Sequence, residues 1–126
     1  MAHWSDRYLG LPYAEADCAE LAARVQREVF GREIGLPSER DGGPFALSDR
    51  IAQHRGDYAE QVSRPRDGDA VLMRARGRLN HIGVYCDIGG EGWVLHALRN
   101  AAQACRHRVT DLPRHQLELE GYYRWL

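Results

Sequence analysis

The first third of the chain carries apolar residues at a helical period. They recur at i, i+3, i+4, i+7 and i+11, which is one stripe of an amphipathic helix, and they are Cys18, Leu21, Ala22, Val25 and Val29. Asp17 is a favourable N-cap, Glu20 stands three residues later where a capping box has its partner, and Gly31 is a favourable stop. The pattern therefore predicts a helix over 17–30.

After residue 65 the period changes to that of strands. Five strands are expected, over residues 70–73, 81–86, 93–97, 106–110 and 121–125. The basic run 74–78 fits a solvated hairpin loop, with a ligand-binding patch as the alternative. Helices first and strands afterwards predict an α+β fold, in which N-terminal helices pack on a mainly antiparallel sheet of about five strands.

The remaining segments are less regular. Residues 4–13 predict a short helix or turn, 32–44 a loop, and 48–54 a second short helix, while the pattern over 55–65 is ambiguous. No repeat, linker or low-complexity segment is evident in the sequence, so residues 1–126 are expected to form one domain.

The composition is that of an ordinary globular protein, with 44% apolar and 28% charged residues. The formal net charge of −1 gives no electrostatic reason to expect nucleic acid or a membrane as a partner. The first residues are charged where a signal peptide has an apolar run, and no segment is long enough to span a bilayer. The chain is therefore expected to be cytoplasmic as synthesised.

The cysteines give no sign of a cross-linked or metal-stabilised framework. There are three, Cys18, Cys86 and Cys105, and they include no C-x-x-C pair. An odd number without that spacing argues against a set of disulfides and against a structural zinc site. Neither a metal nor another cofactor is expected.

Cys18 falls at the first turn of the predicted helix. Backbone N–H groups at a helix start and the positive end of the helix dipole favour a thiolate over a thiol. The same N–H groups can stabilise an oxyanion once the sulfur has attacked a carbonyl. The position therefore suits a nucleophile, while a half-buried core cysteine on the apolar stripe is the alternative.

The pattern of two predicted strands, 81–86 and 93–97, places two histidines close together. A glycine-rich loop joins these strands. A hairpin register that pairs 86 with 93, 84 with 95 and 82 with 97 brings the apolar faces of these strands together. The same register sets Gly83 opposite His96 and places His81 diagonally beside it, within reach on the other face. Gly83 would leave room for the helix start that carries Cys18.

These residues can form a catalytic set. Cys18 would attack, His81 would take its proton or pair with the thiolate, and His96 would hold the His81 ring. A metal site of one cysteine and two histidines is a competing use of the same side chains. The remaining histidines have no such arrangement and are expected to be ordinary polar residues: His3, His54, His107 and His115.

Four sequence blocks resemble the NlpC/P60 cysteine peptidases. They are Tyr8-Leu9-Gly10-Leu11-Pro12-Tyr13 followed by Asp17-Cys18, then Pro65-Arg66-Asp67-Gly68-Asp69-Ala70-Val71, then Asn80-His81-Ile82-Gly83-Val84-Tyr85, and then Val94-Leu95-His96-Ala97. The resemblance implies a papain-like α+β fold and cleavage of peptidoglycan stem peptides, typically at a γ-D-glutamyl bond to a diamino acid. It places the nucleophile at Cys18, the base at His81 and the orienting residue at His96. It also implies that Tyr13 lies near the nucleophile and assists the oxyanion hole, with a packing aromatic as the alternative.

The surroundings of the cysteine depart from the usual family pattern. The glycine-rich loop before it is shortened to residues 14–16, and the usual Ser-Gly after it is replaced by Ala19-Glu20. This version is most similar to stand-alone members encoded with phage tail-assembly genes, which implies phage tail proteins as partners and delivery to the wall by a tail or by lysis. Two alternatives remain open: a catalytically silent tail-assembly or interaction protein, and a papain-like amidase or acyltransferase acting on another amide.

Overall fold

The computed structural model of the protein describes residues 2–34 and 59–126. The second short helix expected over 48–54 lies outside these residues, as does most of the loop expected over 32–44. His54 lies outside them as well.

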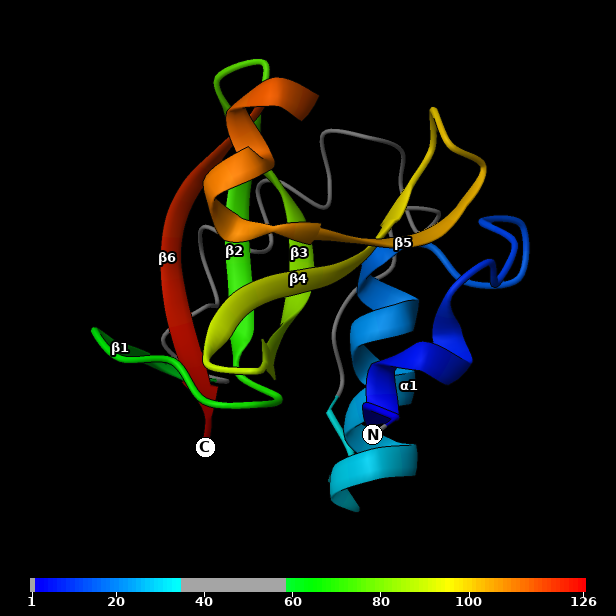
Figure 1. Ribbon diagram of the computed structural model, residues 1–126, viewed down its shortest axis with the longest axis vertical. Helices are drawn as coiled ribbons and strands as arrows, with labels where there is room; N and C mark the ends of the chain where they lie inside the picture. Colours follow the sequence, from blue (N-terminus) through cyan, green and yellow to red (C-terminus); the bar gives the residue numbers. More distant parts are fainter. Residues whose placement is uncertain (1, 35–58) are drawn as a thin grey trace.

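The described residues form one α-helix, two 3-10 helices and six strands (Figure 1). In chain order they are η1 (Trp4–Tyr8), α1 (Cys18–Phe30), β1 (Ala59–Val62), β2 (Ala70–Ala75), β3 (Arg78–Ile88), β4 (Glu91–Leu98), β5 (Gln103–Arg108), η2 (Val109–His115) and β6 (Leu117–Trp125). The strands pair antiparallel in the order β1-β6-β2-β3-β4-β5. The predicted α+β class is therefore confirmed.

The sheet has six described strands rather than the five expected. The additional strand is β1, which lies in the segment whose pattern was ambiguous and pairs with β6. The strand expected over 106–110 begins earlier, at Gln103, and ends at Arg108 because η2 begins at Val109.

The turn between β2 and β3 is shorter than the basic run suggested. Only Arg76 and Gly77 lie outside the strands, and both have a positive φ, of 54° and 76°. Such a pair of dihedrals is that of a tight two-residue hairpin turn, whose twist matches the flanking strands. The other arginines of the run therefore belong to strands rather than to a loop.

α1 begins and ends where the sequence predicts. The Asp17 side chain accepts the Glu20 N–H at 2.9 Å, and the Glu20 side chain accepts the Asp17 N–H at 3.2 Å, which completes the capping box. At the other end Gly31 is left-handed, with φ 66°, and its N–H binds the Gln26 carbonyl.

Apolar residues pack on both faces of the sheet. α1 packs on β3 and β4, and the first core lies there; it includes Leu21, Val25, Ile82, Val84 and Leu95. The second core lies on the other face, against η2, and contains Val71, Met73, Val94, Leu112 and Leu117. Figure 1 shows α1 and the orange η2 on different sides of β4 and β5.

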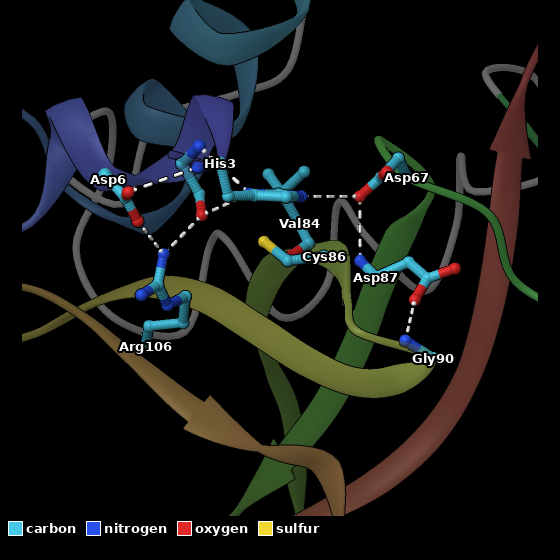
Figure 2. A network of polar contacts seen from close by, with 9 residues as sticks. His3, Asp6, Asp67, Val84, Cys86, Asp87, Gly90 and Arg106 are labelled. Atoms are coloured by element: carbon cyan, nitrogen blue, oxygen red, sulfur yellow. Dashed lines mark hydrogen bonds and ion pairs between the residues drawn. The ribbon is translucent and has the colours of Figure 1, made fainter. Parts of the chain in front are cut away.

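The N-terminal segment is fixed to the sheet by polar contacts (Figure 2). Arg106 of β5 binds the Asp6 carboxylate and donates to the Ser5 hydroxyl at 2.7 Å. His3 lies 3.1 Å from an oxygen of Asp67, which also accepts the Asp87 N–H at 2.7 Å. These contacts hold the start of the chain beside the strands before α1 begins.

The block around Gly68 and Asp69 has a structural role. The Gly68 N–H donates to the Tyr85 carbonyl at 2.9 Å, and the Tyr85 N–H donates to the Asp69 carbonyl at 2.8 Å. The Asp69 carboxylate binds the Arg124 guanidinium at 2.9 Å. A Cβ at residue 68 would lie 2.5 Å from the Phe30 ring, so glycine allows the end of α1 to approach.

Candidate active site

Cys18 is the first residue of α1, as predicted. Its side chain is buried, with 2% exposed, and it shares the first core with Ile82 of β3 and Leu95 of β4. Cys18 therefore lies on the α1 side of β3 and β4, the strands that carry the histidine candidates. By strand alternation His81 and His96 lie on the opposite face, with Met73 and Val94 of the second core.

The segment before α1 runs along the outer edge of β5. The Gly10 N–H donates to the Ala104 carbonyl at 2.9 Å, and the Ala104 N–H donates to the Leu11 carbonyl at 2.8 Å. Ala104 in turn pairs with Ala97, the neighbour of His96. The chain therefore enters α1 from the end of the sheet at which His96 lies.

The other end of α1 is fixed near the opposite end of the β3–β4 hairpin. The Gln26 side chain donates to the Gly68 carbonyl at 2.8 Å, and Gly68 is bonded to Tyr85. Tyr85 is nearer than His81 to the tight turn that joins the two strands. α1 thus runs from the histidine end toward the turn end, which places Cys18 at the former.

The structure brings the two predicted histidines together. His81 Nε2 lies 2.8 Å from His96 Nδ1, within hydrogen-bond distance, and the ring centroids are 5.0 Å apart. The predicted register is confirmed for the pairs Val84↔Leu95 and Cys86↔Trp93, and the ladder ends before the expected pair of residues 82 and 97. The sequence pattern therefore identified a real contact between side chains 15 residues apart.

A bulge lies directly before His81. Met73 pairs with His81 while the next residue, Arg74, pairs with Leu79, so β3 contains one extra residue. Bulges bend a strand and change the direction of the side chains that follow. His81 shares its sheet face with Met73, which belongs to the second core, and it lies where β3 departs from regular pairing.

The sequence predicted that Gly83 leaves room for the start of the helix, and this prediction is wrong. A Cβ at this position would clash with Val94 Cγ1 and would lie 3.0 Å from the Leu95 carbonyl and 3.2 Å from His96 Cβ. The space is filled by β4 itself. Glycine is needed because β4 approaches β3 closely here, and this approach brings His96 to His81.

We expect Gly83→Ala to destabilise the protein by about 1–3 kcal/mol, because the new methyl group overpacks against β4. Chemical denaturation followed by circular dichroism measures the loss. The matched control is Gly121→Ala in β6, where the nearest atom is the end of the flexible Gln61 side chain, and the loss should be smaller. Equal losses of unfolding free energy in the two variants would show that the close approach of β4 is not the reason for glycine at residue 83.

His107 and His115 are not the isolated polar residues that the sequence suggested. His107 Nδ1 lies 2.9 Å from His96 Nε2, and the His107 ring stacks on His115 with centroids 3.7 Å apart. His81, His96, His107 and His115 therefore form a continuous row, which we call the histidine row. No signal in the sequence pairs His107 with His96, because the expected strand began at residue 106 and left out Cys105, the residue that pairs with His96.

Burial keeps the inner rings of the histidine row neutral. It lowers the pKa of His81 to about 4. Burial, followed by the neighbouring imidazoles, lowers the pKa of His96 well below its usual value. Burial and His115 lower the pKa of His107, while the Asp111 carboxylate acts in the opposite direction. Neutral imidazoles at pH 7 can each donate one proton and accept another.

Three side chains on this face could hold a metal ion, although none was expected. His96, Cys105 and His107 each present one donor atom, and these atoms lie within 4.8 Å of one another. His96 is buried, and the other two are partly exposed. The set differs from the competing metal site considered for Cys18, because it uses a different cysteine.

Tyr13 is bonded to the residue directly before β5. Its N–H donates to the Ala102 carbonyl at 2.9 Å, its ring packs against the first core, and the Arg99 guanidinium lies 5.9 Å from the ring centroid. Tyr13 therefore lies between the edge of β5 and the start of α1, against the same core as Cys18.

An α-helix whose first residue is a cysteine, packed on an antiparallel sheet, is the arrangement of papain-like α+β proteins. The model of the NlpC/P60 family matches residues 6–117, and the chain belongs to this family. Membership supports a peptidase-like or amidase-like function on peptidoglycan. No curated protein and no solved structure matched the chain. Among the described residues, no helix has the length and apolar character needed to cross a membrane.

Proposed function

We propose that the protein is a cysteine hydrolase that cleaves peptidoglycan stem peptides at a γ-D-glutamyl bond to a diamino acid. The observation that carries the proposal is the 2.8 Å contact between His81 Nε2 and His96 Nδ1, at the end of the sheet where Cys18 begins α1. Membership in the NlpC/P60 family supports it.

In the proposed site, His96 fixes the tautomer of His81. When His96 Nδ1 accepts the proton of His81 Nε2, the lone pair of His81 stays on Nδ1, where it can take the thiol proton of Cys18. The pKa of about 4 that burial gives His81 keeps this ring neutral before the reaction. A neutral ring is the form that a general base requires.

The reaction follows the usual course of thiol hydrolysis. Cys18 Sγ transfers its proton to His81 Nδ1 and attacks the amide carbon. The C–N bond then breaks, and His81 returns the proton to the leaving amine. Water, deprotonated by His81, attacks the thioester, and the released products are an acid and an amine with the thiol restored.

The start of α1 supplies the oxyanion donors in this proposal. The capping box uses the Glu20 N–H, and the Leu21 N–H binds the Asp17 carbonyl. In the proposal, backbone N–H groups of the first turn beside Cys18 face the developing negative charge, because N–H groups at a helix start are directed along the helix axis. In the proposal Tyr13 adds its hydroxyl to these donors, as the family resemblance implies.

The direct test is incubation with purified muropeptides, with the products identified by mass spectrometry. We expect cleavage between the γ-D-glutamyl residue and the diamino acid, with a free amine released. Cleavage of a different amide bond would contradict the scissile bond proposed here and would favour a papain-like amidase of another specificity. No turnover of any muropeptide would favour a catalytically silent interaction protein.

We also expect Cys18 to be the thiol that iodoacetamide modifies first below neutral pH, although Cys18 is buried and Cys105 is partly exposed. Burial raises the pKa of Cys86 to about 12 and raises that of Cys105, so neither is a ready nucleophile. Mass spectrometry of each cysteine peptide measures the order. Modification of Cys105 before Cys18 would mean that solvent access, rather than activation of the thiol, determines the order of modification.

A further inference from the structure

The face of the sheet opposite α1 carries a second group of chemically reactive side chains. His96 of β4 pairs directly with Cys105 of β5, and His107 lies two residues further along β5. Paired residues and residues two apart in a strand share a face, so the three side chains converge. Only His96 among them belongs to the proposed triad.

The geometry fits a small cation. The three donor atoms lie within 4.8 Å of one another, and His96 Nε2 faces His107 Nδ1 at 2.9 Å. A tetrahedral zinc ion holds nitrogen and sulfur donors about 3.3–3.6 Å apart. The two nitrogens would need to separate by only about 0.4 Å to reach that spacing.

The donors also fit zinc in chemical type and in charge. One thiolate and two imidazoles are ligands that Zn²⁺ prefers, and three protein ligands leave a fourth position for water. Cys105 and His107 are partly exposed, so an ion can enter from solvent.

We propose that His96, Cys105 and His107 bind a zinc ion, and that this ion switches off the hydrolase by reversing the tautomer of His81. The site itself stands on the three donors alone. The switch rests on the proposed function, because it requires His81 to act as the base.

The switch follows from counting protons. In the active form His96 Nε2–H donates to His107, and His96 Nδ1 accepts from His81 Nε2. A zinc ion on His96 Nε2 needs the lone pair there, so the His96 proton moves to Nδ1 and is donated to His81 Nε2. The His81 proton then resides on Nδ1, which can no longer accept one. Cys105 releases its thiol proton to solvent on binding, and no other proton is gained or lost.

Metal binding is tested without any activity measurement. Chelator-treated protein is titrated with Zn²⁺ by calorimetry and with Co²⁺ by absorption, which reports thiolate coordination. We expect one ion per chain, and Cys105→Ala should weaken binding by at least about 100-fold, since loss of an outer partner of a ligand already costs 10–100-fold. Cys18→Ala should bind as the wild type does, and Cys105→Ser guards against a folding defect in the alanine variant.

The opposite pattern would overturn the site. If Cys18→Ala weakened binding and Cys105→Ala did not, the ion would lie between Cys18 and the first two histidines. Absence of binding in the wild type would also overturn it.

The switch has two readouts. The ¹⁵N shifts of the His81 ring should show the proton moving from Nε2 to Nδ1 when Zn²⁺ binds, whether or not a substrate is known. Where muropeptide cleavage is observed, zinc should reduce it by at least about 100-fold, because a base in the wrong tautomer loses that much or more. Chelator should restore the rate, and in Cys105→Ala the ratio of rates with and without zinc should be near one.

These results separate the two proposals. A chain that binds zinc and shifts the His81 proton but cleaves no muropeptide would contradict the proposed function and leave the metal site intact. Zinc binding without movement of the His81 proton would overturn the switch.

Discussion

Cys18→Ala is expected to reduce the cleavage of γ-D-glutamyl peptides by at least about 10⁴-fold, since removing the nucleophile of a hydrolase triad abolishes nearly all of its rate enhancement. The side chain lies in the first core, so loss of its sulfur should also lower the free energy of unfolding by about 1–2 kcal/mol. The rate is measured with muropeptides, and the stability is measured by denaturant unfolding.

The matched control for this variant is Cys86→Ala. Cys86 is also fully buried in the first core, on β3, and it has no part in the proposed reaction. Its replacement should cost similar stability and keep the rate. Equal rate losses in the two variants would mean that the loss reflects damage to the core, and the assignment of the nucleophile would fail.

His81→Ala is expected to be more damaging than His96→Ala, by roughly 50–100-fold in kcat. That ratio is the difference, in a well-studied hydrolase triad, between removing the base and removing the residue that orients it. His81 exchanges protons with the thiol in the proposed reaction, whereas His96 acts on the second nitrogen of His81, 2.8 Å away. The measurement is kcat and KM for each variant with the same muropeptide.

His96→Gln distinguishes orientation from packing. The amide oxygen of glutamine can accept the His81 Nε2–H, so this variant should recover part of the rate lost in His96→Ala. A packing role alone would instead make the recovery follow the unfolding free energy. Equal losses for His81→Ala and His96→Ala would contradict an orienting role and would favour a shared one.

The parts of the site that could be predicted are those defined by local chemistry. α1 has its apolar stripe and both capping signals within 17–31, and these signals depend on no distant residue. The β3–β4 hairpin is closed by Gly89 and Gly90, so its register follows from matching the two apolar faces. Together they place Cys18, His81 and His96 on the correct elements.

The outer half of the histidine row was missed for a physical reason. The turn between β4 and β5 has a left-handed Ala102, with φ 57°, where a glycine or asparagine would have marked it in the sequence. Without that signal the sequence predicted a strand that begins at residue 106, three residues after the observed start of β5. The register of this strand against β4 could therefore not be derived. His107 could therefore not be matched to His96.

His115 could not be found from the sequence pattern at all. It lies in η2, a 3-10 segment that contains Pro113 and has no side-chain cap. The contact with His107 depends on how η2 packs over the second core through Leu112. Such packing is a tertiary effect that no short-range period reveals.

The segment that leads into α1 also covers part of one edge of the sheet. β5 is the last strand of the order, and an exposed edge strand presents unpaired N–H and C=O groups that can recruit strands of another chain. The bonds from Gly10 and Leu11 to Ala104, with the bridge from Pro12 to Gln103, occupy the beginning of that edge. The same few residues therefore lead the chain into α1 and cover part of an edge to which a strand of another chain could otherwise pair.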